Sequence, residues 1–179
     1  MSPHQYSVFD HSIAAAILQL RIDRGKIRPI PFFAALFHEV GEVVWGDIPT
    51  PFKRLCPQIA KVERAIYQNL WVNIGRYLKG VDVEIAARVD CKRVDSLLCY
   101  VEAERVLGLL PSIRDSDFAT DEPPEVVRYA ETIVDAMIHV HPDRSARVFS
   151  RFWHACKGLD VRGNPIKNRI RQFVNGILT

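Results

Sequence analysis

Hydrophobic positions recur with a helical period along most of the chain. Within residues 10–24 they fall at i, i+4 and i+7, which places them on one face of an amphipathic helix. The same spacing predicts a helix over 31–44, which Gly46 and the prolines of "DIPTP" would end. Further helices are predicted over 58–77, 83–107, 124–139, 143–156 and 165–177. No segment shows the period-two alternation of a strand, so the predicted fold is all-α.

The composition fits one globular domain. With 179 residues, of which 48% are hydrophobic, the chain is long enough to bury a core, and it contains no internal repeat or long linker. The four cysteines stand far apart without a C-x-x-C pair, which argues against a disulfide scaffold or a zinc knuckle and favours a reducing cytoplasm. The longest apolar run, "IAAAILQL", is far shorter than the roughly 20 residues of a membrane span, so we expect a soluble cytoplasmic protein with no membrane partner.

The segment "HEVGE" carries the first candidate chemistry. His38 and Glu39 are adjacent, and on a helix Glu42 would share a face with His38. A zinc protease would need a second histidine at position 42, so the H-E-x-x-H interpretation fails.

A metal site assembled from several helices is the alternative interpretation. Its ligands would be His11, His38, Glu39 and Asp95. Two imidazoles and two carboxylates suit zinc, manganese, cobalt or iron. On spacing alone, however, packed histidines and scattered surface carboxylates of ordinary helices explain these residues more often than a metal site does.

Three segments in order carry a family resemblance: "YSVFDHSIAAA", "AALFHEVGEVVWGDIPTPFK" and "KRVDSLLCY". Together they resemble the HD-domain phosphohydrolases, and most of all the branch of bacterial 5'-deoxynucleotidases and phage deoxynucleotide hydrolases. The resemblance covers residues 6–108, more than half of the chain. It implies a single HD-type helical bundle over 1–179, which helices within 124–177 complete.

The resemblance also implies roles for individual residues. One divalent metal ion (Mn, Co, Zn or Fe) would be bound by His11, His38, Glu39 and Asp95. Glu42 would activate or position the attacking water, and Asp47 would hold the substrate or hydrogen-bond the water and the leaving group. The chain has no histidine between 39 and 138, so we expect a mononuclear site. The implied activity is hydrolysis of a small nucleotide, a deoxynucleoside mono- or triphosphate, by a homodimer.

The chain departs from the family at Glu39, where the family has aspartate. The extra methylene moves the carboxylate by about 1.5 Å, against a tolerance of about 0.2 Å for metal–ligand distances. Either the side chain folds back or the helix shifts. Because the other motif positions are intact, we expect a working site. The family's phosphate-binding cation and base-contacting residue precede its first histidine and are not carried over to this chain.

Other candidates have ordinary explanations beside the functional ones. Lys53 and Arg54 follow the proline turn and could contact phosphate, or they could simply be solvated. Trp45 could line the mouth of the pocket or belong to the core. The stripe of Arg144, Arg147 and Arg151 could bind nucleic acid, but the acidic segment 115–125 and a net charge of only +3 favour a solvated face. The main rival function is a non-catalytic HD-fold protein that binds a nucleotide or a partner with an altered metal site.

Overall fold

The computed structural model describes residues 6–41, 55–108, 122–140 and 142–178. These residues form eight helices and no strand, so the all-α prediction is confirmed for the part described. None of these helices is both long and apolar enough to cross a bilayer. The helices are α1 (Val8–Ile22), α2 (Pro29–Phe37), α5 (Pro57–Tyr77), α6 (Val83–Ala86), α7 (Lys92–Arg105), α8 (Pro124–His139), α9 (Pro142–Cys156) and α10 (Asn164–Leu178).

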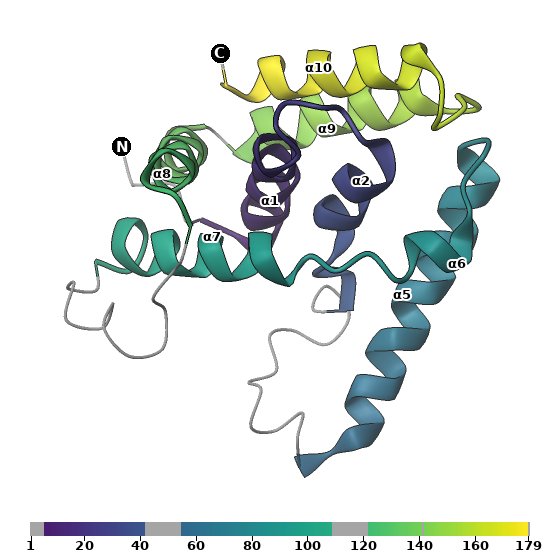
Figure 1. Cartoon of the computed structure of the whole chain (residues 1–179), viewed down its shortest axis with the longest axis horizontal. Coiled ribbons are helices and arrows are strands. Elements are labelled where there is room, and N and C mark those ends of the chain that lie inside the picture. The colour runs from purple at the N-terminus through teal and green to yellow at the C-terminus, as the bar shows by residue number, and fades with distance from the viewer. Residues whose placement is uncertain (1–5, 42–54, 109–121, 141, 179) are drawn as a thin grey trace.

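Helix α1 lies at the centre of the molecule. It packs against α2, α7 and α8, while α9 and α10 lie side by side across the top in Figure 1. The six residues from Ile13 to Leu18 are completely buried, so this stretch of α1 has no solvent face. Three consecutive alanines lie within it, and their small side chains let neighbouring helices approach closely.

The first turn of α1 is fixed by a capping box. The Asp10 backbone N–H donates to Ser7 Oγ at 3.3 Å, and the Ser7 backbone N–H donates to Asp10 Oδ2 at 3.0 Å. This reciprocal pair satisfies two backbone donors that a helix start otherwise leaves without partners. The cap therefore sets where α1 begins, and with it the position of His11 in the first turn.

The helix predicted over 83–107 is wrong as a single element. The structure has two helices, α6 and α7, separated by residues 87–91. Side chains start each of them: Asp82 accepts from the Ile85 N–H at 3.0 Å, and Asp90 accepts from the Lys92 N–H at 2.8 Å. These local bonds compete with a continuous helix. The break places Asp95 in the first turn of α7.

The helix predicted over 31–44 also ends differently. Helix α2 begins at Pro29 and ends at Phe37, His38 and Glu39 form a turn, and residues 40–41, the last described before the gap at 42–54, are helical again. His38 keeps right-handed helical dihedrals (φ −62°, ψ −31°) as the capping residue of α2. The two candidate ligands therefore lie at a helix end and not inside a helix.

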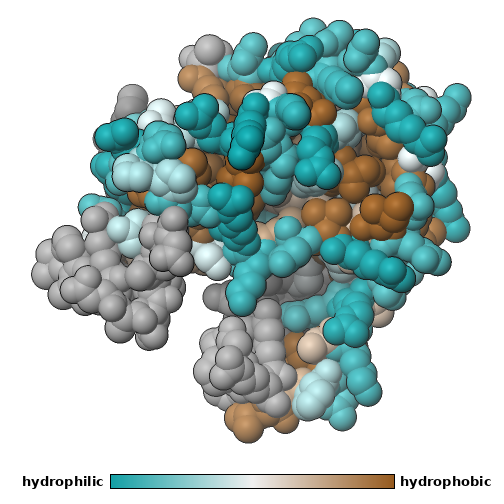
Figure 2. Space-filling view, in the orientation of Figure 1, coloured by the Kyte–Doolittle hydropathy of each residue, from teal (hydrophilic) through white to brown (hydrophobic). Residues whose placement is uncertain are grey.

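Aromatic packing anchors α2 against the C-terminal helices. Phe32 is fully buried, with its ring centroid 6.0 Å from that of Phe152 on α9 and 6.1 Å from that of Phe173 on α10. Helix α5, by contrast, extends down the right-hand side of Figure 1 and exposes Val62 and Val72. Figure 2 shows mostly hydrophilic residues on this face, interrupted by hydrophobic ones. The core thus lies around α1 and α2, which carry or directly precede three of the four candidate ligands, His11, His38 and Glu39.

Replacing Phe32 tests this assignment of the core. We expect Phe32→Ala to lower the free energy of unfolding by about 3–5 kcal/mol, because a fully buried ring is replaced by a cavity. Denaturant unfolding followed by circular dichroism measures the change. Phe9→Ala is the matched control, since Phe9 is 37% exposed and should cost less than half as much. Equal losses for the two variants would contradict the placement of the core.

Candidate metal centre

Four side chains from three elements converge at one point. His11 comes from the first turn of α1, His38 and Glu39 come from the turn after α2, and Asp95 comes from the first turn of α7. Each offers one possible ligand atom, and these four atoms all lie within 4.8 Å of one another. The structure therefore brings together the four residues that the sequence singles out as metal ligands.

The spacing of these atoms fits a single small cation. His11 Nε2 lies 3.2 Å from His38 Nε2 and 3.4 Å from Asp95 Oδ1. His38 Nε2 lies 3.7 Å from Asp95 Oδ1 and 3.1 Å from Glu39 Oε1. With metal–ligand bonds of about 2.1 Å, neighbouring ligand atoms are about 3.0 Å apart at right angles and about 3.4 Å apart in a tetrahedron. The four separations, from 3.1 to 3.7 Å, lie close to these values.

The second nitrogen of each imidazole, Nδ1, is hydrogen-bonded to an acceptor on the side away from the cluster. His11 Nδ1 lies 2.8 Å from Glu102 Oε1 and 3.0 Å from Glu102 Oε2, and His38 Nδ1 lies 2.7 Å from the Ala35 carbonyl oxygen. A carboxylate and a carbonyl only accept, so both Nδ1 atoms carry hydrogen and donate. In the neutral rings both Nε2 lone pairs then point at each other and at two carboxylates. Such an arrangement is repulsive unless a positive charge lies among these atoms.

The pKa values of His11, His38 and Asp95 reflect the same need for positive charge among these atoms. Burial alone would lower the pKa of His11, but hydrogen bonds to Asp95 and Glu102 outweigh it and raise this pKa to about 10. Burial likewise opposes protonation of His38, yet the Asp95 and Glu39 carboxylates raise its pKa to about 9. For Asp95, burial is outweighed by hydrogen bonds to the two histidines, which hold its pKa well below the usual range. Without a metal, protons supply the positive charge.

A cavity of about 420 Å³ opens beside the cluster. Three of the four candidate ligands line it (His11, Glu39 and Asp95), and Val8, Val106 and Leu107 form an apolar wall. Its volume lies within the roughly 300–1,000 Å³ range of small-molecule sites.

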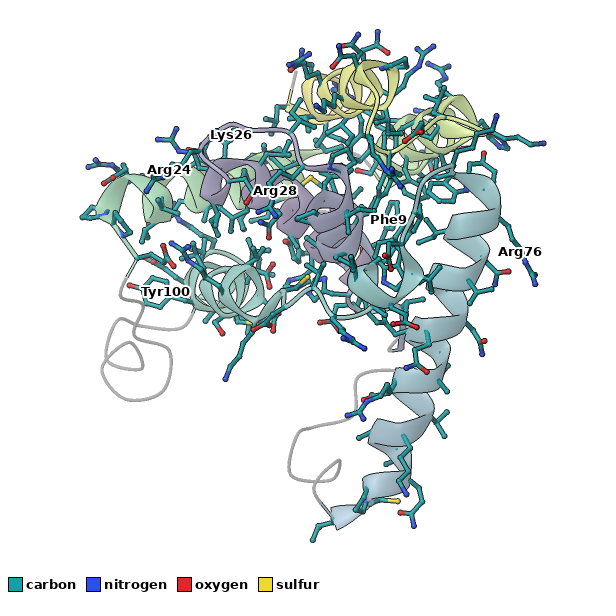
Figure 3. The ribbon with its side chains drawn as sticks, turned by 45° about the vertical axis from the view of Figure 1, so that its right-hand side comes forward. Phe9, Arg24, Lys26, Arg28, Arg76 and Tyr100 are labelled. Carbon is teal, nitrogen blue, oxygen red and sulfur yellow. The ribbon has the colours of Figure 1, made fainter. Side chains whose placement is uncertain are left out.

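The cavity has an acidic lining. Within the described part of the chain, no lysine or arginine lines it. Figure 3 shows basic residues elsewhere, with Arg24, Lys26 and Arg28 on the α1–α2 connection and Arg76 on α5. The described lining therefore favours a cation at the cluster over an anion placed directly against its carboxylates.

Cys99 lines the cavity, and its surroundings favour the protonated thiol. Its Sγ is 3.7 Å from Asp95 Oδ1. Burial and the neighbouring carboxylates of Asp95 and Glu102 raise the pKa of this thiol to about 12, so it stays protonated at neutral pH. Thiolate chemistry at this position is therefore not favoured.

The remaining predicted site residues lie outside the described part of the chain. These are Glu42, Trp45, Asp47, Lys53 and Arg54, and their roles stay predictions. On α9, Arg147 and Arg151 are exposed, while Arg144 donates to the Gly176 carbonyl oxygen at 3.3 Å.

Sequence reasoning missed Glu102 and Tyr6. Glu102 follows Asp95 by seven residues, the spacing of one helix face, and this signal was available in the sequence. Tyr6 gave no such signal, because its contact with Glu102 joins residues 96 positions apart.

Removing the metal should make stability depend on pH. Both histidines have pKa values raised from about 6.5 in the unfolded chain to about 10 and about 9 in the fold, so the folded state binds more protons. This stabilisation is complete below about pH 6.5 and is lost as the pH rises through 9 to 10. We expect the melting temperature of chelator-treated protein to fall across this window, and metal affinity to rise as proton competition ends.

Thermal melts and metal titrations between pH 6 and pH 10 measure both effects. His154→Gln, an exposed change on α9 outside the cluster, should leave the profiles unchanged, whereas His11→Gln should flatten the stability profile. A melting temperature that stays constant or rises over this range would contradict the assignment.

The chain matches no family model, no curated protein and no solved structure among those compared. The resemblance to HD-domain phosphohydrolases therefore rests on the motifs of the sequence.

Proposed function

We propose that this protein is a metal-dependent phosphohydrolase of the HD type, with a helical bundle of that family and a small nucleotide as substrate. The observation that carries the proposal is the convergence of two Nε2 atoms and two carboxylates, within 4.8 Å, beside an open cavity. The order of the three sequence motifs supports it independently. The substrate would be a deoxynucleoside mono- or triphosphate, and the same resemblance implies a homodimer.

The residues of the cluster fit one divalent metal such as manganese, cobalt, zinc or iron. Two imidazole nitrogens and two carboxylate oxygens leave coordination positions for water and substrate. When bound, the metal supplies a polarised phosphoryl oxygen and a water of lowered pKa. Ordinary packed histidines would not need all four polar groups to point at one another, with both imidazoles held through Nδ1 by acceptors.

The chain's own residues would bind and orient the substrate around that point. Val8, Val106 and Leu107 offer apolar surface to the nucleoside and exclude water on that side. The carboxylates of Glu39 and Asp95 repel a phosphate, and a bound divalent cation would reverse the sign of this interaction, so a loaded site would bind phosphate more tightly. In the same proposal, Glu42 accepts the proton of the attacking water, and Asp47 holds the water or the leaving group. Lys53 and Arg54 contact phosphate, and Trp45 lines the mouth of the pocket.

The rival function is a non-catalytic HD-fold protein with an altered metal site. It was suggested by glutamate at position 39 in place of the family's aspartate. Glu39 nevertheless reaches the cluster, because its Oε1 lies 3.1 Å from His38 Nε2. The distance favours a complete ligand set over an altered one.

Loss of one ligand should abolish both metal binding and hydrolysis. We expect His11→Ala and Asp95→Asn to contain no stoichiometric metal by elemental analysis and to release no phosphate from a panel of nucleotides with manganese or cobalt. Asp90→Asn is the matched control, since Asp90 is exposed, precedes α7 and lies outside the cluster. Wild-type protein that binds no metal and releases no phosphate would end the enzyme proposal.

Shortening Glu39 should weaken the site even though aspartate is the residue of the family. Glu39→Asp withdraws the carboxylate by about 1.5 Å from a position already within reach of the cluster. We expect weaker metal binding than in the wild type, measured by isothermal titration with manganese. Unchanged or tighter binding would mean that the turn after α2 adapts to either side chain.

A further inference from the structure

Glu102 joins His11 to Tyr6 behind the candidate metal centre. Both of its carboxylate oxygens lie within 3.0 Å of His11 Nδ1, and the Tyr6 hydroxyl donates to Oε1 at 2.6 Å. The side chains of His11 and Glu102 are only 11% and 16% exposed. The result is a continuous hydrogen-bonded chain from Tyr6 through Glu102 to the cluster, and its central residue, Glu102, lies outside the three motif segments.

We propose that Glu102 is the positioning residue for His11 and that Tyr6 holds Glu102 in place, an inference that rests on the metal site of the proposed function. The Glu102 carboxylate keeps the hydrogen on Nδ1 and so leaves Nε2 as the ligand atom. Its negative charge also makes Nε2 a better electron donor to a metal.

Glu102 does not serve as a metal ligand itself. Its oxygens contact Nδ1, whereas the atom that faces the cluster is Nε2, on the other side of the imidazole ring. Reaching the cluster would require Glu102 to give up its bonds to both His11 and Tyr6. The geometry therefore assigns it to the orientation of His11.

The two histidines are held differently. His38 Nδ1 donates to the neutral backbone carbonyl of Ala35, while His11 Nδ1 donates to a charged side chain. A hydrogen bond to an ionised acceptor is roughly twice as strong as one between neutral groups. His11 is therefore the more firmly oriented ligand and the one whose donor strength a single substitution can change.

Tyr6 makes the arrangement rigid. Burial, with the charge of Glu102, raises the pKa of Tyr6 far above its ordinary value, so its hydroxyl keeps its hydrogen and remains a donor. It shares Oε1 with the N–H of His11, which fixes the rotation of the carboxylate. Tyr6 and Glu102 both line the cavity. The hydrogen bond from the Tyr6 hydroxyl therefore keeps the Glu102 carboxylate directed at His11 and not into the cavity.

Metal affinity and a proton resonance test the inference together. In Glu102→Ala, the affinity for manganese or cobalt should fall by about 10–100-fold, the usual effect of losing such a partner. Glu102→Gln keeps an acceptor for the Nδ1–H without the charge, so we expect a smaller loss. Tyr6→Phe should also cause a smaller loss than Glu102→Ala. The matched controls are Glu104→Gln and Tyr100→Phe on the same helix, neither of which lines the cavity.

The second readout needs no metal. In chelator-treated wild-type protein, the His11 Nδ1–H bonded to a carboxylate should give a downfield, slowly exchanging proton signal in nitrogen-15 NMR. Glu102→Ala should abolish this signal and Glu102→Gln should retain it at a shifted position. A purely structural role for Glu102 would lower the melting temperature without this pattern.

The outcomes separate the inference from the proposed function. Wild-type metal binding with unchanged affinity and an unchanged signal in Glu102→Ala would overturn the role of Glu102 alone. A wild-type protein that binds no metal would instead overturn the proposed function on which the inference rests. If Glu102→Ala does not fold, the isosteric Glu102→Gln replaces it as the test. Wild-type metal affinity and an unshifted Nδ1–H signal in Glu102→Gln would overturn the role of the Glu102 charge.

Discussion

Two imidazole lone pairs and two carboxylates pointing at a common centre have to be compensated by positive charge. His11 Nε2 and His38 Nε2 are only 3.2 Å apart, and both rings are held by acceptors on their far side. Either protons or a metal can supply the charge, and each excludes the other. Because a metal would bind only where all four groups are already in place, its binding free energy adds to the stability of the fold.

Helix ends position the four side chains at their common centre. The capping box at Ser7 sets the first turn of α1, α2 stops just before His38, and α7 starts close to Asp95. Because the chain changes direction at a helix end, even short side chains from separate helices can meet at one point. The fully buried middle of α1 then holds α2, α7 and α8 in fixed relation.

Much of this arrangement could be predicted from the sequence. Helical periodicity is strong over long segments, so the all-α fold and most helix ranges followed from it. Periodicity does not detect a helix end without glycine or proline, and for this reason the end of α2 at Phe37 and the break at residues 87–91 were missed. The four candidate ligands were identified through a resemblance of motifs, since spacing alone favoured ordinary surface residues. Glu102 was not predicted, because its role depends on a contact with His11, which is 91 positions away in the sequence.

The negative charge of the cavity couples the binding of the metal to the binding of the nucleotide in the proposed enzyme. Glu39, Asp95 and Glu102 line it, and in the described part of the chain no basic side chain accompanies them. A phosphate that approaches the metal-free site meets carboxylates at short range, and among the described lining residues only the histidine protons compensate their charge. A divalent cation reverses the sign of this interaction. In the proposed enzyme, affinity for the nucleotide and affinity for the metal would then raise each other by the same factor, as linkage requires. In the proposed enzyme, any residue that strengthens metal binding, Glu102 among them, would therefore also strengthen substrate binding without touching the substrate.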